Sequence, residues 1–268
     1  MVVFPGCKIN IGLNIIGKRD DGFHNIESVF YPLNLSDILE IVESDIFSIK
    51  ISGLSIDVKD SDNLVVKAYE ILKSKFDLPP VAIHLHKIVP MGAGLGGGSA
   101  DAAYTLLLLN DLFDLKISII DLEQYADKLG SDASFFIRNT PMFVEGKGEI
   151  HTPVNINLKG YYIQLINPGI HISTKEAFGT LKLSDNKFDL KHLLEKAPIK
   201  WGDNVKNDFE NSVFQIHPEI KAIKTDLYKN NALFASMTGT GSSVYAIYED
   251  EPSASHPNHF EWIAKLSI

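Results

Sequence analysis

The sequence is poor in cysteine, in long apolar runs and in basic charge. Cys7 is its one cysteine, which excludes an intramolecular disulfide and a cysteine-based metal cluster. The longest apolar runs, such as residues 106–109, are far shorter than the roughly 20 residues that span a bilayer. The N-terminus lacks the basic and apolar segments of a secretory signal. With 34 acidic against 25 basic side chains, binding to nucleic acid phosphates is not expected. We expect a soluble, cytoplasmic protein without a nucleic-acid or membrane partner.

The composition is that of a globular protein. Hydrophobic residues make up 45% and charged residues 22% of the 268 residues, which excludes a disordered chain. The length fits one large domain or two modest ones. Helical and strand-like segments alternate without a fixed repeat, so we expect an α+β protein with domains at residues 1–159 and 160–268.

Periodicity predicts the main elements. Apolar residues alternate with polar ones over residues 8–15, which predicts a strand that is buried on one face and carries Lys8 and Asn10 on its open face. Further strands are expected at 23–31, 38–42, 47–51, 81–86, 143–144, 161–166, 233–237 and 244–248. Helices are expected at 64–76, 102–109, 121–129, 174–178, 189–195 and 218–228.

Five glycines fall within residues 92–98, directly before an apolar helix. Glycine loses more backbone entropy on folding than any other residue, and such density is typical of a backbone that approaches a ligand closely. Together with the positive end of the helix, this segment predicts an anion site of the kind that phosphates occupy. The Ser99 hydroxyl is placed to donate to a phosphate oxygen or to a metal-bound water. The alternative is a flexible turn with Ser99 as a simple helix cap.

The glycine pattern limits which class of phosphate-containing ligand this segment is expected to bind. No lysine follows the glycines, which excludes a P-loop. Residues 92–97 match the dinucleotide fingerprint G-x-G-x-x-G, so a nicotinamide-dependent oxidoreductase stays open as a second hypothesis. However, His84 and His86 give the preceding strand a polar face, which is unusual for that fingerprint. The two histidines have no third ligand in view and are expected to be solvated.

Residues 90–103 resemble the ATP-binding motif P-x-G-x-G-L-G-S-S-A of the GHMP kinases. Residues 4–13 and 238–246 are similar to the N-terminal and C-terminal glycine motifs of that family. The resemblance implies a two-domain α+β fold with the active site in the cleft between domains, and ATP with Mg²⁺ as cofactors. Ser99 is the implied metal ligand. The ATP-binding residues that it implies are Pro90, Met91, Gly92, Ala93, Gly94, Leu95, Gly96, Gly97, Gly98, Ser99 and Ala100.

Residues 17–24 and 129–136 are most similar to one branch of the family. Its acceptor is a cytidine diphosphate-linked methylerythritol, phosphorylated on the C2 hydroxyl in non-mevalonate isoprenoid biosynthesis. Homoserine-type and mevalonate-type acceptors are the alternatives, and a monomer or weak homodimer is expected. The resemblance implies that Lys8 and Asp132 are catalytic. The substrate-binding residues that it implies are Asn10, Phe23, His24, Thr174 and Phe178.

One position has a second interpretation, and two others differ from the residue that the family mostly has there. Asp132 is also placed to cap a helix that starts at Ala133. Phe23 stands where the family mostly has tyrosine, so it keeps a ring for stacking but loses a hydroxyl. Cys7 stands where the family mostly has alanine and is expected to fill space rather than to react. A nucleotide-binding protein without catalysis is a third hypothesis, which the presence of both Lys8 and Asp132 disfavours.

Overall fold

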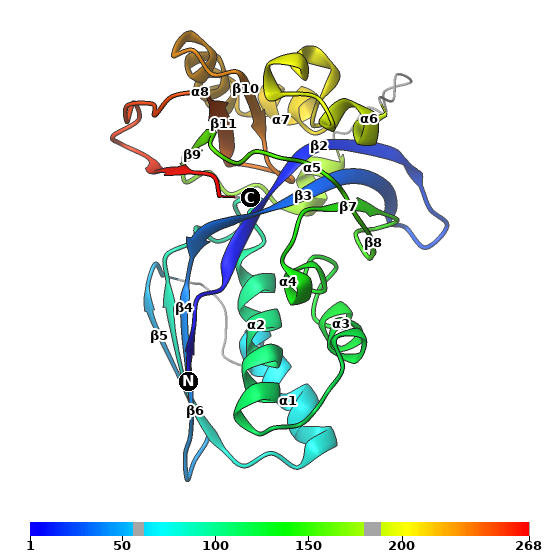
Figure 1. Ribbon diagram of the computed structural model, residues 1–268, viewed down its shortest axis with the longest axis vertical. Coiled ribbons are helices and arrows are strands. Elements are labelled where there is room, and N and C mark those ends of the chain that lie inside the picture. The colour runs from blue at the N-terminus through cyan, green and yellow to red at the C-terminus, as the bar shows by residue number, and fades with distance from the viewer. Residues whose placement is uncertain (56–61, 180–188, 268) are drawn as a thin grey trace. The chain divides into compact units, whose positions relative to one another are not determined.

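The computed structural model describes residues 1–55, 62–179 and 189–267. It contains two compact units, and each is discontinuous in sequence. The first unit comprises residues 1–8, 32–91 and 96–140, and the second comprises residues 9–31, 92–95 and 141–268. Helices and three four-stranded sheets are present (Figure 1), which confirms the α+β class. The domain boundary near residue 160 stays a prediction.

The first unit is built on a sheet of strands in the order β1-β4-β6-β5. β5 and β6 are parallel, and the other neighbours are antiparallel. The histidines of β6 are half-buried, and His84 Nε2 and His86 Nδ1 both lie within hydrogen-bond distance of Ser52 Oγ, at 2.8 and 2.9 Å. The bounds are β1 (Val2–Val3), β4 (Ile38–Glu43), β5 (Ser48–Gly53) and β6 (Val81–Lys87).

Helices of the first unit cover one face of this sheet (Figure 1). The Asn63 side chain caps α1 by accepting a hydrogen bond from the Val65 amide at 2.9 Å. α2 is buried on nearly all sides, and it begins five residues before the expected start because Gly97 and Gly98 join its first turn. The bounds are α1 (Leu64–Phe76), α2 (Gly97–Leu112), α3 (Ile119–Asp127) and α4 (Phe135–Arg138).

The second unit contains a sheet in the order β10-β11-β9-β12, with α8 packed on β10 and β11. Its core includes Ile166, Phe209 and Leu227, which are at most 2% exposed. The strands are β9 (Tyr162–Asn167), β10 (Phe234–Met237), β11 (Val244–Tyr248) and β12 (Phe260–Lys265). The helices are α5 (Thr174–Gly179), α6 (Leu190–Leu194), η2 (Pro198–Lys200), η3 (Gly202–Asn204), α7 (Glu210–Ile216) and α8 (Pro218–Lys229).

The third sheet has the order β2-β3-β7-β8. Its strands are β2 (Gly6–Lys18), β3 (His24–Ser36), β7 (Met142–Glu145) and β8 (Ile150–Pro153). The prediction that β2 is buried on one face only is wrong, because Lys8, Asn10 and Asn14 are only 2–3% exposed. Their polar groups are tolerated inside because they have hydrogen-bond or ionic partners.

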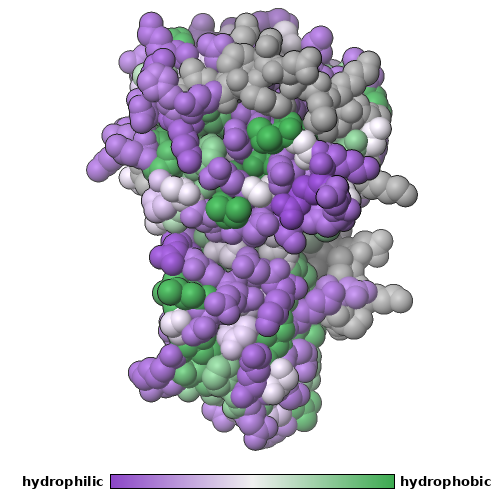
Figure 2. All heavy atoms as spheres, turned by 90° about the vertical axis from the view of Figure 1, so that its right-hand side faces the viewer, coloured by the Kyte–Doolittle hydropathy of each residue, from purple (hydrophilic) through white to green (hydrophobic). Residues whose placement is uncertain are grey.

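The surface carries scattered rather than continuous apolar groups. Figure 2 shows hydrophobic residues as small separate patches among hydrophilic ones on the face that it displays. Exposed apolar side chains such as Ile46 and Ile120 come from different elements, and isolated cases of this kind are normal for a folded surface. No helix within the described part of the chain is both long and apolar enough to cross a membrane.

Candidate active site

A lysine and an aspartate form the centre of the candidate site in the first unit. Lys8 Nζ on β2 lies 3.3 Å from Asp132 Oδ2, in the turn before α4. The lysine side chain is 4% exposed, whereas the aspartate side chain is 29% exposed. The expected open lysine is therefore buried, and the carboxylate is the more accessible member. A buried ammonium needs such a partner, because an uncompensated buried charge is costly.

Asp132 does not cap the following helix. α4 begins at Phe135 with Ser134 in the cap position and no side-chain cap bond. The Ala133 amide instead donates to the Gly130 carbonyl oxygen at 3.0 Å, which closes a turn. The competing interpretation of Asp132 as a helix cap is therefore wrong, and its carboxylate faces Lys8.

The start of α2 lies beside this pair. A Cβ atom on Gly96 would lie 3.0 Å from the Phe136 ring and 3.3 Å from Lys8 Cε. Ser99 Oγ lies 3.6 Å from the position of a Cβ on Gly130, two residues before Asp132. Gly96 is the helix cap with a φ of 71° and supplies no side-chain acceptor. The first amides of α2 thus have no side chain capping them and stand next to the catalytic candidates.

The preceding glycine segment packs against a second one within the second unit. A Cβ atom on Gly94 would lie 2.1 Å from the Thr238 carbonyl oxygen, and Thr238 Oγ1 donates to the Gly94 carbonyl at 3.2 Å. The Ser243 amide donates to the Ala93 carbonyl at 3.3 Å. At Gly94 the missing side chain therefore makes room for another loop of the protein. Ala93 and Leu95 are buried, so of the two only the backbone is available to a ligand.

Asn10 holds these loops in place. Its Nδ2 donates to Ser28 Oγ at 2.9 Å, and its backbone amide donates to Thr238 Oγ1 at 2.9 Å. Asn207 Nδ2 donates to the carbonyls of Met237 and Gly239 at 2.9 and 2.8 Å. Thr238 belongs to a motif visible in the sequence, whereas Asn207 carries no local sign of this role. Its function depends on where the fold places it.

Two of the expected substrate-binding aromatic residues lie in the second unit as a stacked pair. The His24 and Phe178 ring centroids are 4.5 Å apart at an interplanar angle of 20°. Burial, and secondarily the Lys18 charge, lowers the pKa of His24 below its ordinary value of 6.5. The imidazole is therefore mainly neutral at pH 7, with one donor and one acceptor nitrogen.

Phe23 lies at the end of the turn that joins β2 to β3. The turn is closed by the Arg19 amide, which donates to the Phe23 carbonyl at 2.8 Å. Phe23 is 57% exposed, and Lys147 Nζ lies 5.2 Å from the centroid of its ring. Thr174, also expected to bind substrate, begins α5, but its side chain lies outside the described residues.

Three charged residues in the first unit form a buried group that the sequence did not single out. Lys87 donates to Asp37 and, at 2.6 Å, to Asp101 of α2. Burial raises the pKa of Asp101 to about 7, although Lys87 acts in the opposite direction. Lys87 and Asp101 also line a pocket of about 230 Å³ whose walls include Leu64, Leu85 and Met91. This pocket lies at the end of β6 and the first turn of α2.

Cys7 is buried, and burial raises the pKa of its thiol to about 12. A thiol in this state is not a nucleophile near pH 7, in agreement with a packing role. Among residues 1–55, 62–179 and 189–267, no group of three or more histidine, cysteine, aspartate or glutamate side chains is arranged to hold a metal ion.

Comparisons with known proteins point to one family. The model of the GHMP kinases N terminal domain matches residues 63–144, and that of the GHMP kinases C terminal matches residues 189–256. A relative from Azobacteroides pseudotrichonymphae genomovar. CFP2 is 47% identical over 93% of this chain and 94% of its own length. A relative from Bacteroides thetaiotaomicron is 49% identical over 94% of this chain and 93% of its own length. Both are named 4-diphosphocytidyl-2-C-methyl-D-erythritol kinase.

Two solved structures are similar to this chain in fold. A crystal structure of 4-(cytidine 5'-diphospho)-2C-methyl-D-erythritol kinase matches with a TM-score of 0.80 at 25% identity, covering 92% of this chain and 90% of that one. A homoserine kinase from Cytophaga hutchinsonii matches with a TM-score of 0.61 at 16% identity, over 97% and 94% of the two chains. The latter likeness concerns the fold alone.

Proposed function

The chain belongs to the GHMP kinase family, and on that premise we propose that it phosphorylates the C2 hydroxyl of 4-diphosphocytidyl-2-C-methyl-D-erythritol with ATP as donor. The observation that carries the proposal is the Lys8–Asp132 pair, at 3.3 Å, beside the start of α2. The names of the relatives support this acceptor. The reaction belongs to non-mevalonate isoprenoid biosynthesis.

The ATP phosphates bind at the start of α2. The uncapped amides of Gly97, Gly98 and Ser99 point to the N-terminal end of a 16-residue helix, where the helix dipole favours negative charge. The adenine ring is assigned to the neighbouring pocket of about 230 Å³. Its leucine and methionine walls suit a flat apolar ring, and Asn63 and Asp101 supply polar atoms at its edge.

Lys8 and Asp132 act on the acceptor hydroxyl. As its oxygen forms a bond to the γ-phosphorus of ATP, the bond from that phosphorus to the leaving oxygen of ADP breaks. Asp132 accepts the proton that the hydroxyl loses, and its partial exposure leaves it open to substrate. The Lys8 ammonium beside it stabilises the negative charge that develops on the reacting oxygens.

The cytidine end binds at the turn between β2 and β3. Neutral His24 offers one donor and one acceptor, which matches the amino group and ring nitrogen at the edge of cytosine. The exposed ring of Phe23 provides a face for stacking. Phe178 holds the His24 ring by stacking on it. Lys147, above Phe23, adds positive charge for the diphosphate group.

Magnesium is expected to accompany ATP. The Ser99 hydroxyl, near Gly130, is the oxygen donor that the chain supplies at the start of α2. Mg²⁺ is usually held by few protein oxygens together with water and substrate phosphates, so one hydroxyl and the phosphates of ATP fit this mode. When bound, the metal neutralises phosphate charge.

An assay of ADP release over a panel of acceptors tests the proposal. With Mg²⁺ and ATP, we expect turnover with 4-diphosphocytidyl-2-C-methyl-D-erythritol and none above background with homoserine or mevalonate. Thermal stabilisation by ATP with Mg²⁺, but not by NAD or NADP, is the accompanying result. Stabilisation by NAD alone, or turnover with homoserine in preference, would contradict the proposal.

A further inference from the structure

The second unit contains a pocket of about 540 Å³ beside α7 and α8. It shares no residue with the two glycine segments or with the His24–Phe178 pair. Three lysines and one glutamate are its charged lining residues: Lys206, Lys221, Lys224 and Glu210. Lys206 has an interaction of its own, so Lys221 and Lys224 are counted against Glu210, and they leave one positive charge in excess in a chain whose net charge is −9.

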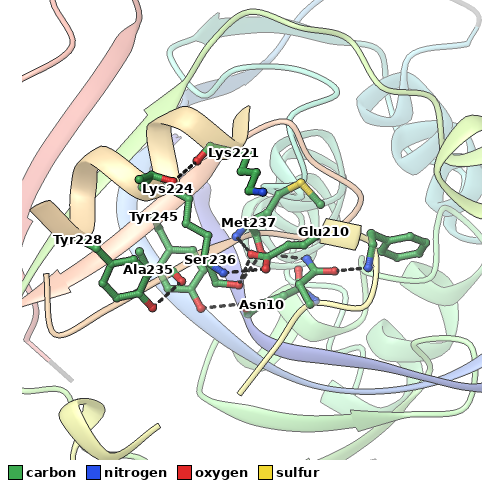
Figure 3. A network of polar contacts seen from close by, with 12 residues as sticks. Asn10, Glu210, Lys221, Lys224, Tyr228, Ala235, Ser236, Met237 and Tyr245 are labelled. Carbon is green, nitrogen blue, oxygen red and sulfur yellow. Dashed lines mark hydrogen bonds and ion pairs between the residues drawn. The ribbon is translucent and has the colours of Figure 1, made fainter. Parts of the chain in front are cut away.

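Glu210 is paired with Lys224 and does not neutralise Lys221. Glu210 Oε2 accepts a hydrogen bond from Lys224 Nζ at 2.7 Å, while Oε1 accepts from the Met237 amide at 2.8 Å and from Ser236 Oγ at 3.1 Å. Figure 3 shows this network, in which a buried carboxylate joins α8 to β10. The Glu210 carboxylate therefore compensates the Lys224 ammonium and accepts two hydrogen bonds from β10.

Lys221 is a lining lysine that Glu210 does not neutralise. It extends from α8 to the same side as Lys224, toward Glu210 (Figure 3). Within the described part of the chain its ammonium has no carboxylate within ion-pair distance. Lys221 and Lys224 are three residues apart on one helix face, so an anion bound there would reach both ammonium groups and would compensate the charge of Lys221.

The remaining walls define the rest of the ligand. Val205 and the half-buried Phe214 give the pocket an apolar side, and the Lys224 ammonium lies 6.0 Å from the Phe214 ring centroid. The volume falls within the usual range for small-molecule pockets, about 300–1,000 Å³, and exceeds what a single phosphate group fills. We propose that this pocket binds a small molecule in which a diphosphate group is joined to an apolar body, with the diphosphate on Lys221 and Lys224.

Calorimetric titration tests the proposal with inorganic diphosphate and n-pentyl diphosphate as ligands. Each is titrated into the full chain with and without a saturating non-hydrolysable ATP analogue, which fills the nucleotide site. We expect n-pentyl diphosphate to bind at one site in both conditions, and more tightly than inorganic diphosphate. The titration without nucleotide does not require a functional kinase site. If the proposed kinase activity is absent, this titration therefore still tests whether the pocket binds a diphosphate.

Two variants locate the site. Lys221→Gln removes the unpaired ammonium and is expected to weaken binding about tenfold or more, as loss of a charge-assisted hydrogen bond does. Lys229→Gln is the matched control, because Lys229 lies on the same helix, pairs with Asp226 and does not line the pocket. Its affinity is expected to equal that of the wild type. Absence of binding, equal affinity of wild type and Lys221→Gln, or equal affinity for the two ligands would overturn the proposal.

Discussion

At the scale of single residues, the proposed active site depends on an asymmetric ion pair. Lys8 is almost completely buried, whereas Asp132 keeps 29% of its side chain exposed. The lysine is thereby fixed in place, and the carboxylate keeps an open side for a substrate. The alternation of residues 8–15 predicted the strand and the common face of Lys8 and Asn10. It did not predict their burial, because burial depends on partners far away in sequence.

Replacing Asp132 by asparagine tests its role as a base. Because the amide does not accept the hydroxyl proton, we expect kcat to fall by roughly 10²–10⁴-fold, the usual contribution of a general base. KM for ATP is expected to change little. Steady-state kinetics measure both constants, and Asp127→Asn serves as control because Asp127 is an exposed aspartate at the end of α3. A kcat within a few-fold of the wild type would show that Asp132 is not the base.

The role that we propose for His24 predicts that binding of the acceptor depends on pH. Burial lowers its pKa below 6.5, so the ring is neutral at pH 7 and gains a proton only at lower pH. The protonated ring has no acceptor nitrogen, and KM for the cytidylylated acceptor is therefore expected to rise as pH falls below 6. KM for ATP is the internal reference. A KM for the acceptor that stays constant between pH 5 and 7.5 would contradict this role.

At the scale of elements, the glycines before α2 serve packing as well as the ligand binding that we propose for them. The sequence suggested close approach to a ligand throughout, but Gly94 makes close contact with the backbone of Thr238. Periodicity located α1, α3 and α8, whose apolar residues follow a helical repeat, and a continuous apolar run located α2. It missed α7 and β12, whose apolar patterns are short, and the roles of Asn207 and Glu210, which depend on contacts with β10 and the loop after it.

Alanine at Gly94 is expected to destabilise the protein more than alanine at Gly169. Both glycines have a left-handed backbone, with φ of 77° and 76°, so both variants incur a strain of about 1–2 kcal/mol. Only at Gly94 does the added Cβ meet another atom, the Thr238 oxygen at 2.1 Å, whereas nothing lies within 4 Å at Gly169. Urea denaturation measures the free energy of unfolding of each variant. Equal losses would show that the two glycine loops are not held together as described.

At the scale of the whole molecule, the buried group of Lys87, Asp37 and Asp101 couples stability to pH. The pKa of Asp101 is raised on folding to about 7, so the folded protein binds a proton here more tightly than the unfolded chain does. The stability contributed by this group is complete below about pH 4 and is lost as pH rises toward 7. Asp21, Asp226 and Glu261 have lowered pKa values and act in the opposite direction.

Asp101→Asn isolates this contribution, because the amide resembles the protonated acid and does not titrate. Between pH 5 and 7.5, the wild type is expected to lose stability relative to Asp101→Asn, as measured by urea denaturation at both values. Asp127→Asn, at an exposed position, is expected to follow the wild type. If the difference between wild type and Asp101→Asn does not change with pH, Asp101 does not bind the additional proton.

The family was predictable from the sequence because three glycine-containing motifs stand in the expected order, and each motif is local. The two compact units were not, since residues 9–31 and 92–95 join a unit formed mainly by residues 141–268. That division depends on pairing between distant segments such as Leu13 and Asn207, which no local pattern records.

Phosphorus NMR of the reaction product tests the central claim most directly. After incubation with ATP, Mg²⁺ and 4-diphosphocytidyl-2-C-methyl-D-erythritol, we predict one new phosphomonoester signal per ADP formed. It should belong to a phosphate on C2, the carbon that bears the methyl group, with the diphosphate bridge intact. A phosphate on another hydroxyl, or ADP formed together with free phosphate and unchanged acceptor, would contradict the account.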